Sequence, residues 1–273
     1  MCRLLGLASK KQVKIDYWFF DAEVPFKDFS EKKINKGPHN SGWGVAWLES
    51  NIVKDINLSL SSQGQNCSNI NVLDYRWNIF KEGKEDVIKY NFNKISQIKS
   101  KIIVMHLRRA SVGSETTKNA HPFSYQNYVF AHNGGIAIKG IINYLAEKFK
   151  KEIKTHTDSE LYFLLIMQFL EETNDIIEAI KKTLNIVRKY NYKGLNFLMS
   201  DGENLYAFRD VSPEHKNLYG YYCLHYLVKD KNKDKNKEGI ISSDPLTKDE
   251  WQPISLRELL IIDKNINIKK LIV

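Results

Sequence analysis

The most reactive side chain of this sequence stands at its second position, behind the initiator methionine, in the opening MCRLLGLAS. Cysteine is often buried as a core residue, but it usually lies inside an element rather than at a chain end that tends to fray. If Met1 is removed, Cys2 carries a thiol and an α-amino group on one residue. A free α-amino group titrates at about 7.7–8.0 and a free thiol at about 8.5, so the neutral amine can accept the thiol proton. Cys2 is therefore a candidate nucleophile that supplies its own base.

Two segments end an apolar run in groups that bind anions. KIIVMHLRRASVG places Arg108 directly after a buried apolar run, where its guanidinium could bind a substrate carboxylate in a bidentate pair. The alternative is an ordinary surface salt bridge. NYVFAHNGG ends in Asn133 and Gly134, and a carboxamide beside a glycine N–H offers two donors for an oxyanion. A plain Asn–Gly turn is the alternative there.

Two further segments carry weaker signals. HNSGWGVAW places Gly42 and Gly44 at the head of a strand, which indicates close backbone approach or a bulge, with Trp43 packed in the core. HTDSELYF begins a helical pattern with Thr157 or Asp158 as the N-cap and Glu160 near the third helical position. The Asp158 carboxylate could equally face a substrate ammonium.

The composition narrows the classes of function. The net charge of +9 is mostly lysine and is interleaved with acidic residues, which disfavours nucleic-acid binding. No apolar run reaches the length of about 20 residues that a membrane helix needs, and the opening does not read as a signal peptide, so a cytoplasmic protein without membrane contact is expected. The three cysteines form no CxxC pair, and the histidines show no HExxH or His-x-His spacing. We therefore expect no metal and no cofactor.

The hydrophobic patterning predicts one α+β domain over residues 1–273, because neither repeats nor a Pro/Gly/Ser-rich linker interrupts it. The first half of the chain contains four predicted strands, over 3–9, 42–48, 101–107 and 127–133. The predicted helices span 69–83, 140–152, 158–172 and 174–190. More strands follow over 195–202, 204–210, 218–228, 239–245, 258–264 and 267–273. Asp201–Gly202 predicts a hairpin, and the charged stretch 229–239 predicts a solvated loop.

Taken in order, Cys2, GWG, HLRRASVG, NAHPF, HNG and TDSE resemble the class II glutamine amidotransferase family, whose members are N-terminal-nucleophile hydrolases. LNFLMSDGENLYAFRD and SSDPL further resemble a stand-alone subgroup that includes γ-glutamyl hydrolases of ergothioneine synthesis and glutathione breakdown. The resemblance implies a four-layer αββα sandwich of two mainly antiparallel sheets. It also implies hydrolysis of the γ-amide of glutamine or a γ-glutamyl compound through a thioester on an N-terminal cysteine.

The resemblance assigns roles residue by residue. Cys2 would be the nucleophile, and Asn133 with the Gly134 N–H would form the oxyanion hole. Arg108 would bind the substrate α-carboxylate and Asp158 its α-ammonium. The remaining substrate-binding residues implied by the resemblance are Ser111 and His132.

The sequence departs from many synthase-linked relatives at Arg109, where they carry Trp, and at Val112, where several carry His, which leaves the acyl donor open. The partner is expected to be a small-molecule substrate. The alternatives are a glutaminase subunit that supplies ammonia to a separate synthase, and a non-catalytic binding module that kept the fold.

Overall fold

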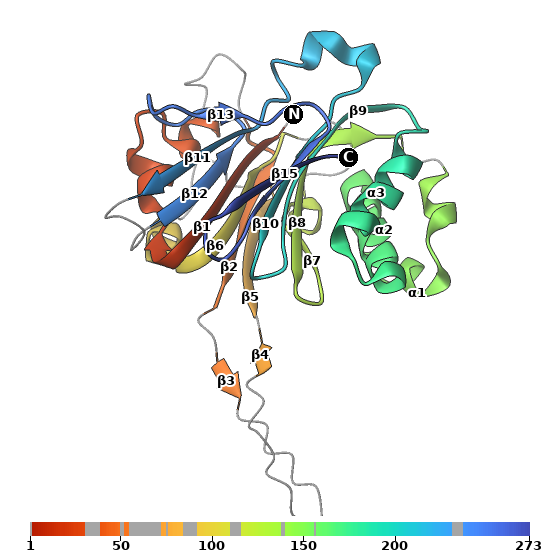
Figure 1. Cartoon of the computed structure of the whole chain (residues 1–273), viewed down its shortest axis with the longest axis horizontal. Helices are drawn as coiled ribbons and strands as arrows, with labels where there is room; N and C mark the ends of the chain where they lie inside the picture. Colours follow the sequence, from red (N-terminus) through yellow and green to blue (C-terminus); the bar gives the residue numbers. More distant parts are fainter. Residues whose placement is uncertain are drawn as a thin grey trace, which may run out of the picture.

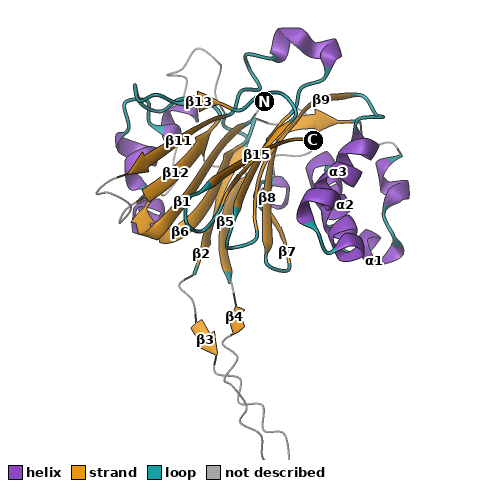
Figure 2. Cartoon of the chain, in the orientation of Figure 1, coloured by secondary structure: helices purple, strands orange, loops and turns teal. Residues whose placement is uncertain are grey.

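The computed structural model describes residues 2–30, 39–49, 52–54, 72–74, 76–83, 92–109, 116–137, 140–155, 157–230 and 237–273. Two antiparallel β-sheets lie face to face at its centre, with helices on the outside (Figures 1 and 2). The first sheet has the order β13-β11-β12-β1-β6-β2-β5 and the second the order β15-β14-β10-β9-β8-β7.

The strands of the first sheet are β13 (Gln252–Pro253), β11 (His225–Asp230), β12 (Lys237–Ser242), β1 (Arg3–Lys14), β6 (Lys99–Leu107), β2 (Gly42–Leu48) and β5 (Trp77–Gly83). Those of the second are β15 (Ile268–Ile272), β14 (Glu258–Ile262), β10 (Leu205–Arg209), β9 (Tyr192–Ser200), β8 (Tyr128–Ile136) and β7 (Phe123–Tyr125). A separate two-stranded ribbon pairs β3 (Ile52–Lys54) with β4 (Val72–Asp74).

Apolar side chains separate the layers. Between the two sheets the buried residues are small or branched, which lets the sheets approach closely; they include Leu4, Ala46, Val104, Ala131, Leu198 and Ala207. On the outer face of the second sheet pack α1 (Glu147–Lys150), α2 (Asp158–Thr173) and α3 (Ile176–Val187), over a core rich in phenylalanine. The ring of Phe130 on β8 stacks on that of Phe163 on α2, with ring centroids 5.1 Å apart.

The outer face of the first sheet has a thinner cover. Two short helical segments, Tyr17–Asp21 and Phe26–Phe29, lie on it and bury bulky rings such as Trp18 and Phe26. Large aromatic side chains cover much apolar area per residue, so two short turns form this layer. The αββα sandwich of two antiparallel sheets is thereby confirmed.

Helix α2 begins as its sequence predicts. Thr157 is the N-cap, and its hydroxyl accepts the N–H of Glu160 at 3.3 Å. The predicted Asp201 hairpin joins β9 to β10, and the Asp201 carboxylate accepts the N–H groups of Glu203 and Asn204. The charged stretch lies mostly outside the described residues, but the strands that flank it, β11 and β12, pair antiparallel.

Three element predictions are wrong. The helix over 69–83 is replaced by β4 and the edge strand β5, because Trp77–Gly83 pairs along its whole length with β2. The helix over 140–152 is broken into a 3₁₀ turn, Ile141–Tyr144, and α1. The Gln168 side chain supports this break, since it accepts the Ala146 N–H and donates to the Tyr144 carbonyl.

The third wrong prediction concerns residues 218–228, where β11 starts only at His225. Arg209 holds the preceding segment in an irregular path. Its guanidinium donates to the carbonyls of Tyr219, Tyr222 and Ile254, so these backbone acceptors are satisfied without a sheet partner. Among the helices of the described ranges, none has the length and apolar character needed to cross a membrane.

Candidate active site

Antiparallel pairing of β1 with β6 sets Cys2 beside Arg108. Arg3, the first residue of β1, lies opposite Leu107, the last residue of β6, so the residues next to them face each other beyond the strand ends. The Cys2 side chain is buried at 9% exposure and Arg108 at 5%. The thiol lies 3.9 Å from the Arg109 carbonyl oxygen, to which it can donate.

Asn133 reaches Cys2 from the second sheet. It lies in the middle of β8, so HNGG is part of a strand and not a turn. The Cys2 N–H donates to Asn133 Oδ1 at 3.0 Å. The side chain is fully buried, and its Nδ2 group has no hydrogen-bond partner among the residues that the structure describes. An unpaired buried N–H₂ costs about 1–3 kcal/mol, so this donor beside the thiol requires an explanation.

Gly134 follows Asn133 at a point where β8 and β9 come unusually close. A Cβ atom at Gly134 would collide with the Gly194 carbonyl and with the His132 ring. Only glycine fits here, because any side chain would push the two strands apart. At Gly135, by contrast, a Cβ would meet nothing within 4 Å.

Asp158 is the first residue of α2 and lies beside the end of β8. Its Oδ2 accepts the Ile136 N–H at 2.9 Å, which ties the start of the helix to the strand that carries Asn133. Asp158 is only half-buried, and its carboxylate acts electrostatically on the Cys2 thiol.

The charges around the thiol act in opposite directions. Burial raises the pKa of Cys2, the Arg108 guanidinium lowers this pKa, and the Asp158 carboxylate raises it. Both charged groups are therefore close enough to act on the sulfur. The structure thus brings together Cys2, Arg108, Asn133 and Asp158, which are up to 156 positions apart in the sequence.

His132 occupies the opposite face of β8 from Asn133, because successive side chains of a strand alternate. Its Nε2 donates to the Gly194 carbonyl at 3.2 Å, so Nδ1 is the acceptor for the Ser159 hydroxyl at 2.9 Å. Burial lowers the pKa of His132, in keeping with this neutral form. A role of His132 in binding substrate stays a prediction. The predicted site residue Ser111 lies outside the described residues.

Sequence reasoning missed Arg3, a residue whose side chain contacts the backbone of Cys2. Its side chain is fully buried, and its Nη1 donates to the Cys2 carbonyl at 3.0 Å. Its Nε lies 3.0 Å from an Asp244 oxygen, and its guanidinium lies 4.5 Å from the centroid of the Tyr221 ring. The signal available in the sequence was an arginine inside the apolar run CRLLGLA, where a charge must be paired.

Buried histidines lie around the site. The rings of His106 and His121 contact each other, with centroids 4.2 Å apart, and burial and nearby positive charge hold the pKa of each well below its usual value. Burial and the Arg3 guanidinium lower the pKa of His39 to about 3. Within the part of the chain that the structure describes, no group of three or more His, Cys, Asp or Glu side chains is arranged to hold a metal ion.

Comparison with known proteins agrees with this architecture. The family model "Glutamine amidotransferases class-II" matches residues 1–268, so the chain belongs to the class II glutamine amidotransferases. An uncharacterized protein of Methanocaldococcus jannaschii is 28% identical, over 96% of this chain and 69% of its own length. A Haemophilus influenzae protein, whose name assigns it provisionally to the glutamine amidotransferases, is 26% identical over 92% of this chain and 80% of its own.

A solved structure shares the fold at low sequence identity. The class II glutamine aminotransferase domain protein of Silicibacter pomeroyi superposes with a TM-score of 0.60 at 18% identity, covering 99% of this chain and 98% of that one. The fold and the family therefore define an enzyme of the glutamine amidotransferase and amide hydrolase class.

Proposed function

We propose that this protein hydrolyses the γ-amide of glutamine or of a γ-glutamyl compound through a thioester on Cys2, after removal of Met1. The proposal rests on one observation above the others. The Asn133 carboxamide binds the Cys2 nitrogen through its oxygen, and its buried Nδ2 group has no partner within the described part of the chain. A donor left unpaired beside a nucleophile is what stabilisation of an oxyanion requires.

The proposed reaction is an acyl transfer in two steps, formation of a thioester on Cys2 and its hydrolysis by water. The α-amine of Cys2 takes the thiol proton, the thiolate attacks the γ-carbonyl carbon, and the carbonyl oxygen becomes an oxyanion. Asn133 Nδ2–H and the Gly134 N–H donate to that oxyanion. The C–N bond breaks as the proton on the α-ammonium passes to the leaving nitrogen, which departs as ammonia or an amine. Water then hydrolyses the thioester to glutamate and restores the thiol.

Arg108 and Asp158 supply opposite charges for the head of the substrate. An amino acid zwitterion needs a cation for its carboxylate and an anion for its ammonium, held apart. Both groups act electrostatically on the Cys2 sulfur, so each lies near the reaction centre. Fixing the head in this way directs the γ-amide to the thiolate, and such positioning contributes several kcal/mol to lowering the barrier.

The test compares two cysteine variants. Cys2→Ala should abolish release of glutamate from glutamine and from γ-glutamyl peptides. Cys223→Ala should retain activity, because the Cys223 thiol lies in the irregular segment and donates to the Tyr219 carbonyl. Measuring ammonia and free amine alongside glutamate identifies the leaving group.

Mass spectrometry provides the second readout. Active protein should lack Met1, and acid quenching during turnover, before water hydrolyses the thioester, should trap an adduct with the mass of a glutamyl group on the N-terminal peptide. Full activity of Cys2→Ala, or full activity of protein that retains Met1, would overturn the mechanism.

A further inference from the structure

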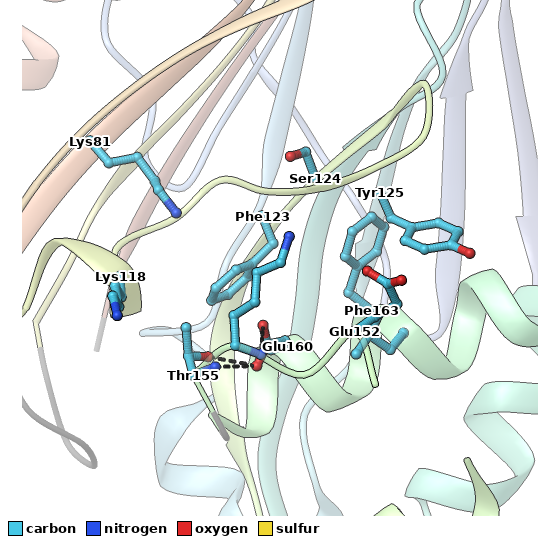
Figure 3. A pocket seen from close by; sticks show the side chains of 11 residues that line it. Lys81, Lys118, Phe123, Ser124, Tyr125, Glu152, Thr155, Glu160 and Phe163 are labelled. Carbon is cyan, nitrogen blue, oxygen red and sulfur yellow. Dashed lines mark hydrogen bonds between the residues drawn. The ribbon is translucent and has the colours of Figure 1, made fainter. Parts of the chain in front are cut away.

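A cavity of about 430 Å³ opens between the edge of the two sheets and the start of α2 (Figure 3). Its walls come from β5, β7, the Thr117–Asn119 turn, the segment before α2, and α2 itself. None of Cys2, Arg108, Asn133 and Asp158 lines it. Its residues have no part in the reaction proposed above.

Lys81 on β5 projects into this cavity (Figure 3). Its stem packs across Gly44 of β2, where a Cβ atom would lie 3.0 Å from Lys81 Cγ. Its ammonium lies 5.3 Å from the centroid of the Phe123 ring. Burial lowers the pKa of Lys81, Glu160 opposes this, and Lys154 adds to it, so the ammonium is partly stripped of water.

The Glu160 carboxylate, which lines the same cavity, already accepts hydrogen bonds from other groups. Glu160 Oε1 accepts the Lys154 N–H at 2.9 Å, and Oε2 accepts the Thr155 N–H and hydroxyl at 2.7 and 2.8 Å. The ion pairs that the described lysines form include none made by Lys81, Lys118 or Lys154. Three lysines therefore line the cavity, and none of them forms an ion pair with a residue that the structure describes.

The rest of the lining is apolar on one side and acidic at the far end. The buried rings of Phe123 and Phe163, together with Leu164, form the apolar wall. Glu152 stands beside Tyr125, away from Lys81 and Lys118 (Figure 3). An anionic group is thus favoured at the Lys81 end, and an apolar body is favoured against the phenylalanines.

We propose that this cavity is a second ligand site, which binds a small organic anion with a phosphate or carboxylate head on the lysines and a ring or alkyl body on Phe123. An anion would give Lys81 the charged hydrogen-bond partner that its half-buried ammonium lacks, and such bonds are stronger than neutral ones. An aromatic body would remove the apolar wall from water.

The test uses phenyl phosphate and benzoate as probes, titrated into the full-length protein by calorimetry, with inorganic phosphate as the headgroup alone. At least one aryl anion should bind saturably and more tightly than inorganic phosphate. Comparing phenyl phosphate with benzoate then shows whether the lysines prefer a phosphate or a carboxylate group. Lys81→Gln should weaken binding about ten-fold or more, the loss expected for one charged hydrogen bond. Lys154→Gln, in the segment before α2, is a second variant and should likewise weaken binding.

The matched control is Lys269→Gln, which removes one positive charge from an exposed position on β15 and should leave binding unchanged. Cys2→Ala should also bind normally, so failure of the proposed catalysis does not affect this test. The proposal is overturned if neither aryl anion binds, if Lys269→Gln weakens binding as much as Lys81→Gln, or if glutamate displaces the probe, which would make the cavity part of the substrate site.

Discussion

Asn133 and Asn196 form a pair whose substitutions should have opposite consequences. They face each other on β8 and β9, and both are fully buried. Asn133 has one satisfied oxygen and one unsatisfied Nδ2 group. Asn196 is satisfied at both ends, since its oxygen accepts the Asp210 N–H at 2.9 Å and its Nδ2 donates to the Tyr222 carbonyl at 3.2 Å.

The expected magnitudes follow from these partners. Asn133→Ala leaves the Cys2 nitrogen unpaired, at about 1–3 kcal/mol, but removes an unpaired Nδ2 group of similar cost, so the free energy of unfolding should change by about 1 kcal/mol or less. On the proposed mechanism the same substitution removes one of two oxyanion donors, so kcat should fall by about 10²–10³. Asn196→Ala leaves the buried Asp210 N–H unpaired and removes one of the two donors to the Tyr222 carbonyl, which keeps its hydrogen bond from Arg209, so the free energy of unfolding should fall by about 1–3 kcal/mol.

The assay measures glutamate release at saturating substrate together with urea unfolding of each variant. The Asn133 variant should be stable and slow, and the Asn196 variant unstable yet within about ten-fold of the parent kcat at temperatures where it is folded. If Asn133→Ala lost as much stability as Asn196→Ala and kept kcat within ten-fold, the unpaired amide would have no catalytic role.

Other substitutions test the structure around the site. Gly134→Ala should lower the free energy of unfolding by about 2–3 kcal/mol in urea melts because its methyl group collides with β9, whereas Gly135→Ala should cost about 0.5 kcal/mol or less. Arg3→Met should lower the free energy of unfolding by about 3–5 kcal/mol because it removes the buried guanidinium that pairs with the Asp244 carboxylate, and adding Asp244→Asn should recover part of the loss; full additivity of the two changes would argue against the pair. Because burial holds the pKa of His121 well below its usual value, only the unfolded chain takes up this proton as the pH falls below about 6.5. His121 alone should then lower the stability by about 1.4 kcal/mol per pH unit below that pH, and His121→Gln should reduce the measured slope by this amount; an unchanged slope would contradict the assignment.

Much of the sandwich is predictable because its central strands are buried on both faces. Each of these strands contains a continuous apolar run, namely VAWL in β2, IIVM in β6 and FLM in β9, and such runs predict interior strands. The prediction of a helix at the edge strand β5 was wrong because the side chains of this strand are all partly exposed, and their apolar pattern fits a helix as well as a strand. Its identity comes from pairing with β2, a tertiary contact that a local pattern does not contain.

For the site, the sequence indicates which polar residues are candidates, but not that they lie close together in the fold. Arg108 and Asn133 could be recognised as polar residues in or after apolar runs, but Cys2 lies next to them through strand register and the packing of one sheet on the other. Only the resemblance to a known family predicted that these three residues lie in one site. Arg3 was missed since arginine is usually exposed, and the Asp244 that pairs with it is remote in sequence.

The hydrogen bond between the Cys2 nitrogen and Asn133 has a consequence for maturation. In the chain that still carries Met1, this nitrogen is a peptide N–H, and it already donates to the Asn133 oxygen. If Met1 is removed as proposed, the chain that still carries it already holds thiol, carboxamide and charged neighbours together and lacks only a basic amine. On the proposed mechanism, excision of one residue would switch the enzyme on by a change of protonation chemistry alone, without any rearrangement of its core.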